Sequence, residues 1–263
     1  MKALSKEEIE QICNLYRTHG NLRDVSLKSS RSLGVVHKYI TSNGLIKKQN
    51  IAKEVCTDDD RLIGTYVGLW LGDGTQYKDR HQYTIKICSN KEDVNLNQFI
   101  QNVILKIFNK TTNLLKETKT KRAHIKIHSR FIYNFIQNYV TYEIGKKTYT
   151  AKLRKRTGCY NVPFLEGCLL GLTLSDGYLK NNFVFGVASS RLAKNVYDIL
   201  KKFGYNPRYS IQRREKYHWK NLYIIFLNKE QSNRLRLLLD KVIHDLGFCY
   251  SFQELKYGLG RTS

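Results

Sequence analysis

Two stretches of thirteen residues decide the fold of this chain: LIGTYVGLWLGDG at residues 62–74 and LEGCLLGLTLSDG at residues 165–177. Asp73 in the first stretch and Asp176 in the second lie 103 residues apart. Four further pairs match at the same offset, Gly64/Gly167, Gly68/Gly171, Gly72/Ser175 and Gly74/Gly177. A constant offset at five positions indicates an internal repeat.

The segments that follow the two motifs also correspond. The first motif precedes a strand-like segment at 82–88, a helical pattern at 92–108, a basic strand region at 114–127 and a helical pattern at 131–140. The second precedes a strand at 182–187, a helix at 192–203, a strand pair within 208–227 and a helix at 231–246. Each half therefore predicts helix, strand pair, helix, strand pair, helix, which gives subdomains at 61–160 and 161–263.

Small residues recur every four positions in both motifs and form one stripe along each predicted helix. The stripes consist of Gly64, Gly68 and Gly72, and of Gly167, Gly171 and Ser175. Glycine costs a helix about 1 kcal/mol per residue, so close helix contact must compensate for it. We expect these residues to form the interface between the two motif helices, with Asp73 and Asp176 side by side at one end.

An aspartate at the C-terminal end of a helix, beside a second aspartate, is electrostatically unfavourable unless a cation is bound. Oxygen ligands without histidine or cysteine suit Mg²⁺, which retains water ligands and binds substrate phosphates. Asp73 and Asp176 are therefore predicted metal ligands for phosphodiester hydrolysis. The simpler alternative is that each Asp-Gly pair only ends a helix, with Gly74 and Gly177 as left-handed caps. Because the whole motif occurs twice, we favour a metal site over a simple helix end.

The charge of the chain indicates a polyanionic partner. The formal net charge is +23, and residues 61–263 hold 35 basic and 14 acidic side chains. Because the basic residues are dispersed rather than gathered on one amphipathic helix, nucleic acid is favoured over a membrane surface. Apolar runs are too short to span a bilayer, so we expect a soluble intracellular protein of the cytoplasm or an organelle matrix or stroma. The six cysteines lack the spacing of a zinc site or disulfide framework.

The segments 66–74 and 169–177 resemble the two copies of the LAGLIDADG motif of homing endonucleases. Tyr66 and Val67 replace the usual leucine and alanine, which affects packing, whereas both aspartates are retained. The resemblance implies an α+β fold, in which a pseudo-twofold pair of αββαββα subdomains forms a DNA-binding saddle of antiparallel sheets. It also implies a monomer that cuts both strands of a long asymmetric DNA site with Mg²⁺ or another divalent metal and leaves short 3′ overhangs.

Strand alternation predicts which side chains face DNA. They are Gln82, Thr84, Lys86, His124 and Lys126 in the first half, and Ser210, Gln212 and Arg214 in the second. A solvated charged surface would explain any one of them equally well. The resemblance also implies one basic catalytic residue near the metal in each half. The candidates are Lys126 or His128 in the first half and Lys229 or Lys220 in the second.

Residues 1–48 predict a separate all-α module. Ser5 and Glu8 have capping-box spacing, and three short helical patterns follow. This arrangement resembles a helix-turn-helix unit whose last helix would present Arg31, His37 and Lys38 to DNA. A packing bundle without DNA contact is the alternative, and residues 49–60 are predicted to be a linker.

Two other functions fit the same charge. One is an RNA maturase that binds a group I intron, and the other is a DNA-binding regulator that has lost catalysis. Retention of both Asp73 and Asp176 favours the endonuclease.

Overall fold

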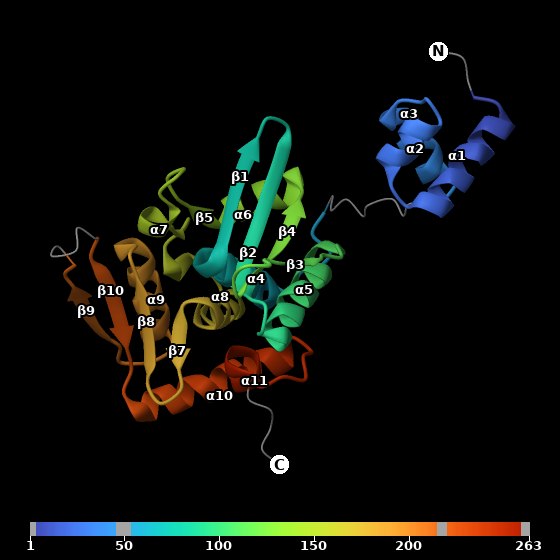
Figure 1. The fold of residues 1–263 in the computed structure, drawn as a ribbon. Helices are drawn as coiled ribbons and strands as arrows, with labels where there is room; N and C mark the ends of the chain where they lie inside the picture. The colour runs from blue at the N-terminus through green and yellow to red at the C-terminus, as the bar shows by residue number, and fades with distance from the viewer. Residues whose placement is uncertain (1–3, 46–53, 215–219, 259–263) are drawn as a thin grey trace. The chain divides into compact units, whose positions relative to one another are not determined.

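The protein is described by a computed structural model that covers residues 4–45, 54–214 and 220–258. Two compact units make up the chain, Met1–Asn50 and Ile51–Ser263. The N-terminal unit holds α1 (Lys6–His19), α2 (Leu22–Lys28) and α3 (Leu33–Ser42) (Figure 1). Ile12, Val25, Val36 and Ile40 form its own small core. The predicted capping box of Ser5 and Glu8 begins α1.

The larger unit contains the αββαββα pattern twice. The first copy runs α4 (Asp60–Asp73), β1 (Gly74–Asp79), β2 (Gln82–Asn90), α5 (Val94–Phe108), β3 (Leu114–Lys116), β4 (Arg122–His128) and α6 (Arg130–Tyr139). The second runs α8 (Val162–Ser175), β7 (Gly177–Leu179), β8 (Phe183–Val187), α9 (Ser190–Lys202), β9 (Arg208–Gln212), β10 (Leu222–Phe226) and α10 (Lys229–Asp245).

Short elements absent from the sequence prediction join and close the two halves. Between them lie β5 (Val140–Thr141), α7 (Lys147–Thr150), β6 (Lys152–Leu153) and the 3₁₀ helix η1 (Thr157–Cys159). After the second half comes α11 (Phe252–Tyr257), which begins with a capping box formed by Ser251 and Glu254.

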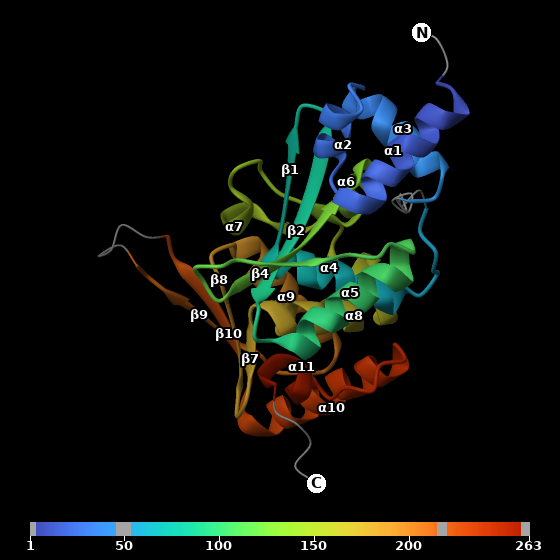
Figure 2. The same cartoon turned by 45° about the vertical axis from the view of Figure 1, so that its right-hand side comes forward.

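Each half contributes one four-stranded antiparallel sheet, and the two sheets share one topology. Their strand orders are β1-β2-β4-β3 and β7-β8-β10-β9. Ile85 pairs with Ile127 and Ile87 with Ile125, and all four point to the core. Figures 1 and 2 show the sheets on either side of the central helices α4 and α8. The predicted α+β class with antiparallel sheets is confirmed.

The two motif helices meet almost backbone to backbone. A Cβ atom added to Gly64, Gly68, Gly167 or Gly171 would lie closer than 3.0 Å to a backbone atom of the opposite helix. Any larger residue would therefore force the helices apart. Around this contact a single hydrophobic core continues through both halves.

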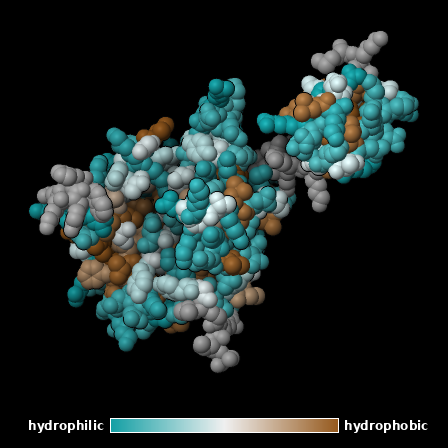
Figure 3. Space-filling view, viewed as in Figure 1, coloured by the Kyte–Doolittle hydropathy of each residue, from teal (hydrophilic) through white to brown (hydrophobic). Residues whose placement is uncertain are grey.

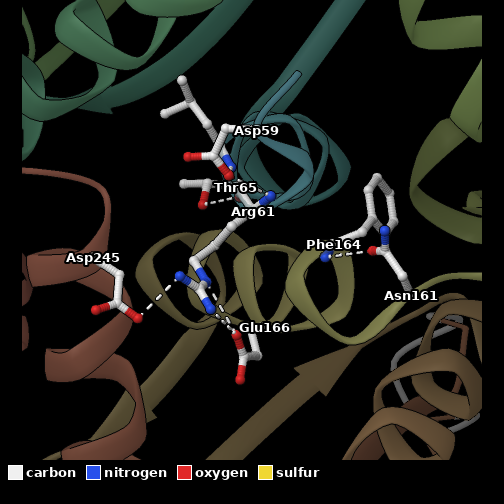
Figure 4. A network of polar contacts seen from close by, with 8 residues as sticks. Asp59, Arg61, Thr65, Asn161, Phe164, Glu166 and Asp245 are labelled. Atoms are coloured by element: carbon white, nitrogen blue, oxygen red, sulfur yellow. Dashed lines mark hydrogen bonds and ion pairs between the residues drawn. The ribbon is translucent and has the colours of Figure 1, made fainter. Parts of the chain in front are cut away.

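Arg61 ties the beginning of the helix pair together, as Figure 4 shows. Its guanidinium donates to Glu166 of α8, with Nη2 2.7 Å from Oε2, and to Asp245 of α10, with Nη1 2.9 Å from Oδ2. Asp59 caps α4 and Asn161 caps α8. The register of the two helices is thus held by charge at one end and by glycine packing along their length.

Candidate metal centre and nucleic-acid interface

Both motif helices end at an aspartate followed by a glycine that turns directly into a strand. Gly74 has extended backbone angles, φ −80° and ψ 148°, and Gly177 is not among the glycines with positive φ. The alternative of left-handed caps is therefore wrong. The glycines are required by space, because a Cβ would lie 2.6 Å from the Cα of Trp70 at Gly74 and 2.7 Å from the Cα of Thr173 at Gly177.

Asp73 and Asp176 come together across the helix interface. A Cβ on Gly72 of α4 would lie 3.0 Å from the Oδ2 atom of Asp176, so the second carboxylate reaches the end of the first helix. Burial, and then the charge of Asp176, raise the pKa of Asp73 to about 6. Burial of the carboxylate also raises the pKa of Asp176, although part of this residue remains exposed to solvent. The structure therefore places two coupled carboxylates where ionising both is costly.

Two lysines stand over the ends of the motif helices in matching positions. Nζ of Lys147 on α7 donates to the carbonyl oxygens of Leu71 at 2.7 Å and Gly72 at 2.9 Å. Nζ of Lys256 on α11 donates likewise to Leu174 at 2.6 Å and Ser175 at 2.9 Å. Their cations oppose the negative helix ends, and both lower the pKa values of the two aspartates.

Partial burial also acts on the lysines themselves. It lowers the pKa of Lys147 to about 8, against the opposing charges of Asp176 and Asp73. It lowers the pKa of Lys256 as well. Each ammonium is thus held in place by two carbonyls within a partly desolvated site. Sequence reasoning missed both residues. The capping-box spacing of Ser251 and Glu254 was an available signal for α11, whereas α7 offers no comparable one.

The donor set of this centre fits a hard divalent cation. Among the described residues no group of three or more His, Cys, Asp or Glu side chains is placed to hold a metal. Two carboxylates are therefore the protein ligands available here, and water or substrate phosphate oxygens would complete the coordination shell. This division of ligands is typical of Mg²⁺ sites that act on phosphates.

The outer face of the first sheet is polar and basic. Lys86 and Lys126 lie directly opposite each other on β2 and β4, a like-charge pair that destabilises the sheet unless an anion is near. The exposed Gln82 lies on the same face, and His124 is partly exposed there. Thr84 differs from the prediction: it is 1% exposed, and its hydroxyl lies 3.1 Å from Nδ1 of His128. Thr84 positions that ring and offers almost no surface of its own.

The outer face of the second sheet combines a polar edge with an apolar centre. Ser210 and Gln212 lie on this face of the edge strand β9, all five residues of which are exposed. The central positions on this face are Val184, Ile224 and Phe226. Figure 3 shows hydrophobic surface over β8 and β10, whereas the β1–β2 hairpin is largely hydrophilic.

A cavity of about 490 Å³ lies between Asp176 and residues of the second sheet. Its lining includes Asp176, Lys147, Arg214, Lys220 and Leu222. Arg214, which was predicted to contact DNA, lines the same cavity as Asp176.

Comparison with solved structures shows what this arrangement is similar to. A structure of mesophilic variants of the homing endonuclease I-DmoI matches with a TM-score of 0.51 at 16% identity, covering 69% of this chain and 97% of that one. I-DmoI in complex with DNA and Mn matches with a TM-score of 0.52 at 14% identity and the same coverage. The protein has the LAGLIDADG homing endonuclease fold. By sequence, the chain matches no family model and no curated protein.

Within this LAGLIDADG fold, the basic residues predicted for catalysis are not the cations that act on the pKa values of the aspartates, although Lys220 lines the same cavity as Asp176. Lys126 and His128 belong to β4, and Lys229 is exposed at the start of α10. Among the described residues, the cations that lower the aspartate pKa values are Lys147 and Lys256. Burial, followed by the charges of Lys126 and Lys110, lowers the pKa of His128.

The N-terminal unit precedes the two αββαββα copies and is a separate compact unit. His37 and Lys38 are exposed on α3. Arg31 forms an ion pair with Glu8 of α1, so it contributes to the packing of the three helices. No helix among the described residues of the protein is long and apolar enough to cross a membrane.

Proposed function

We propose that this protein is a divalent-metal-dependent, site-specific endonuclease that cuts both strands of duplex DNA as a monomer. The observation that carries the proposal is the pairing of Asp73 and Asp176 at the ends of two helices in backbone contact. Their ionisation is unfavourable in the protein alone, and bound cations would reverse that cost. We expect Mg²⁺, when bound, to supply a metal-activated water and to stabilise the leaving oxygen.

The protein's own residues prepare the centre for DNA. Asp73 and Asp176 would hold the cations, and the ammonium groups of Lys147 and Lys256 would orient the helix ends and face the incoming phosphates. We assign the auxiliary basic role to this lysine pair because it interacts electrostatically with both carboxylates. The pair takes the place of the candidates Lys126, His128, Lys229 and Lys220.

The two sheets would follow the grooves of a long target. Lys86 and Lys126 would contact phosphates, since neutralisation by DNA relieves their mutual repulsion. Gln82 and Gln212 would read base edges. Because the outer faces of the two sheets differ, the expected target is asymmetric. We further propose that cleavage leaves short 3′ overhangs and that the N-terminal unit is a helix-turn-helix module that extends the DNA footprint through His37 and Lys38.

Cleavage of a randomised duplex library by the purified protein tests this proposal. We expect discrete double-strand cuts with Mg²⁺ that disappear in EDTA and in the Asp73→Ala/Asp176→Ala variant. That variant should still bind the selected site. Salt-sensitive DNA binding without any cleavage would refute the endonuclease and favour a silent regulator. Retention of intron-splicing activity by the double variant would indicate a maturase.

A further inference from the structure

A second basic surface lies on the side of the second half that faces away from the proposed DNA saddle. It surrounds a cavity of about 650 Å³ between α9 and the segment that joins the two halves. The joining segment contributes Lys152, Arg154, Lys155 and Arg156, and α9 contributes Arg191 and Lys194. Lys202 also lines it, and among the described residues the lining holds one carboxylate, that of Asp198, which forms an ion pair with Lys194 at 3.5 Å. So dense a positive charge repels itself unless an anion is present.

The register of the sheet shows that this surface is separate from the saddle. Tyr209 lies opposite Ile225, which is buried, so both face the side that α9 covers. Ser210 pairs with Ile224 on the opposite, outer side. A duplex held against the outer face would therefore not cover the cavity behind α9.

A smaller cavity of about 530 Å³ adjoins the first and shares Arg191 and Lys194 with it. Tyr209, Tyr197 and Pro207 provide its apolar lining. The ring of Tyr209 is held edge-on against that of Tyr197, with centroids 6.4 Å apart, yet 42% of the residue remains exposed. An ordered aromatic ring next to basic side chains can stack an unpaired base whose phosphates bind the cations.

The basic cavity also contains an unused polar group. Thr157 is only 6% exposed, and its hydroxyl has no hydrogen-bond partner among the described residues. It lines the cavity beside the basic segment. A buried hydroxyl without a partner is costly, and a phosphate or sugar oxygen in the cavity could accept its hydrogen bond.

We propose that this surface, formed by residues 152–156, α9 and Tyr209, binds a single-stranded nucleic acid. Phosphates would lie along the arginine and lysine side chains, and an unpaired base would stack on Tyr209. Paired bases cannot expose a face to the tyrosine, so unpaired strands are favoured over a duplex. The inference adds a second binding surface to the proposed endonuclease and does not depend on cleavage.

Fluorescence anisotropy with a labelled, non-self-complementary 15-nucleotide RNA tests the proposal, with the same sequence as single-stranded DNA in parallel. Lys155→Ala/Arg156→Ala should weaken RNA binding and flatten the slope of log K against log salt by roughly 1.4, about 0.7 for each lost phosphate contact. Tyr209→Leu should weaken binding at least about fivefold, the lower limit for losing one base stack, while Tyr209→Phe should not.

The matched control removes two cations from the saddle instead. Lys86→Ala/Lys126→Ala should leave RNA affinity unchanged and weaken duplex binding, whereas Lys155→Ala/Arg156→Ala should leave duplex cleavage unchanged. Equal affinity for RNA and single-stranded DNA would support recognition of backbone and base alone, and preference for RNA would support an RNA partner. Loss of RNA binding in the saddle variant, displacement of RNA by duplex, or no measurable RNA binding would each overturn the proposal.

Discussion

Replacing Asp73 by asparagine should make the metal-free protein more stable at neutral pH while abolishing cleavage. The pKa of Asp73 is raised from 3.8 to about 6, mainly by burial and then by the charge of Asp176. At about 1.36 kcal/mol for each tenfold change in proton affinity, this difference in pKa corresponds to on the order of 3 kcal/mol. That is the cost of keeping Asp73 ionised in the folded protein at pH 7.5 without metal.

The pH dependence of this effect has a definite sign. Because the folded pKa exceeds the unfolded one, the folded state binds the proton more tightly, so the stabilisation is complete below pH 3.8 and is lost as pH rises through about 6. Asparagine keeps the shape of the side chain without the charge. The Asp73→Asn variant should therefore gain up to about 3 kcal/mol in free energy of unfolding at pH 7.5, and the gain should vanish near pH 4.

Urea denaturation in EDTA at both pH values measures the difference, with Asp79→Asn at the exposed end of β1 as the matched control. Adding Mg²⁺ should then stabilise the wild-type protein more than Asp73→Asn, because binding requires the ionised carboxylates. If Asp73→Asn is no more stable than wild type at pH 7.5 while Asp79→Asn is neutral, the carboxylate is not disfavoured there and our account of the centre fails.

Three further changes test other parts of the structure. Gly68→Ala should destabilise the fold by at least about 1–3 kcal/mol, because its Cβ would enter the backbone of α8, whereas Gly158→Ala, with no atom nearby, should be neutral in the same thermal melts. Lys147→Met should slow cleavage about 100-fold or more with little change in DNA affinity, measured by single-turnover kinetics and anisotropy; an unchanged rate would contradict the assigned role. Replacing thymine by uracil in the half-site against the second sheet should weaken binding, since Val184, Ile224 and Phe226 can contact the thymine methyl group. An equal effect in the other half-site would count against this reading.

The parts of the structure that depend on regular spacing could be predicted from the sequence. Small residues at every fourth position identified the interface between α4 and α8, since a Cβ at most of these positions would meet the backbone of the opposite helix. Alternation along β2 and β4 predicted which isoleucines enter the core. Asp73 and Asp176 occupy equivalent positions in the two motifs. The two carboxylates therefore come together when the motif helices pack against each other.

The lysines escaped prediction for a physical reason. Lys147 and Lys256 sit on helices of four and six residues, too short for a hydrophobic period to be visible. They lie 109 residues apart rather than 103, so the repeat does not align them. Tertiary contact decides their role, because each one caps a helix distant in sequence. The burial of Thr84 likewise depends on neighbouring side chains that strand alternation does not include.

The same close helix contact both builds the centre and makes it costly. Without glycine along the stripe the helices would separate, and the mutual repulsion of Asp73 and Asp176 would fall. With glycine at these positions, the two carboxylates lie together in a partly desolvated centre. Lys147 and Lys256, which donate to the backbone carbonyls, offset only part of the free-energy cost of ionising both aspartates. Because the lysines are fixed by backbone oxygens, they are not free to move onto the carboxylates and neutralise them fully. The remaining negative charge is therefore available to a divalent cation, and occupancy of the centre should be coupled to the stability of the helix pair that forms it.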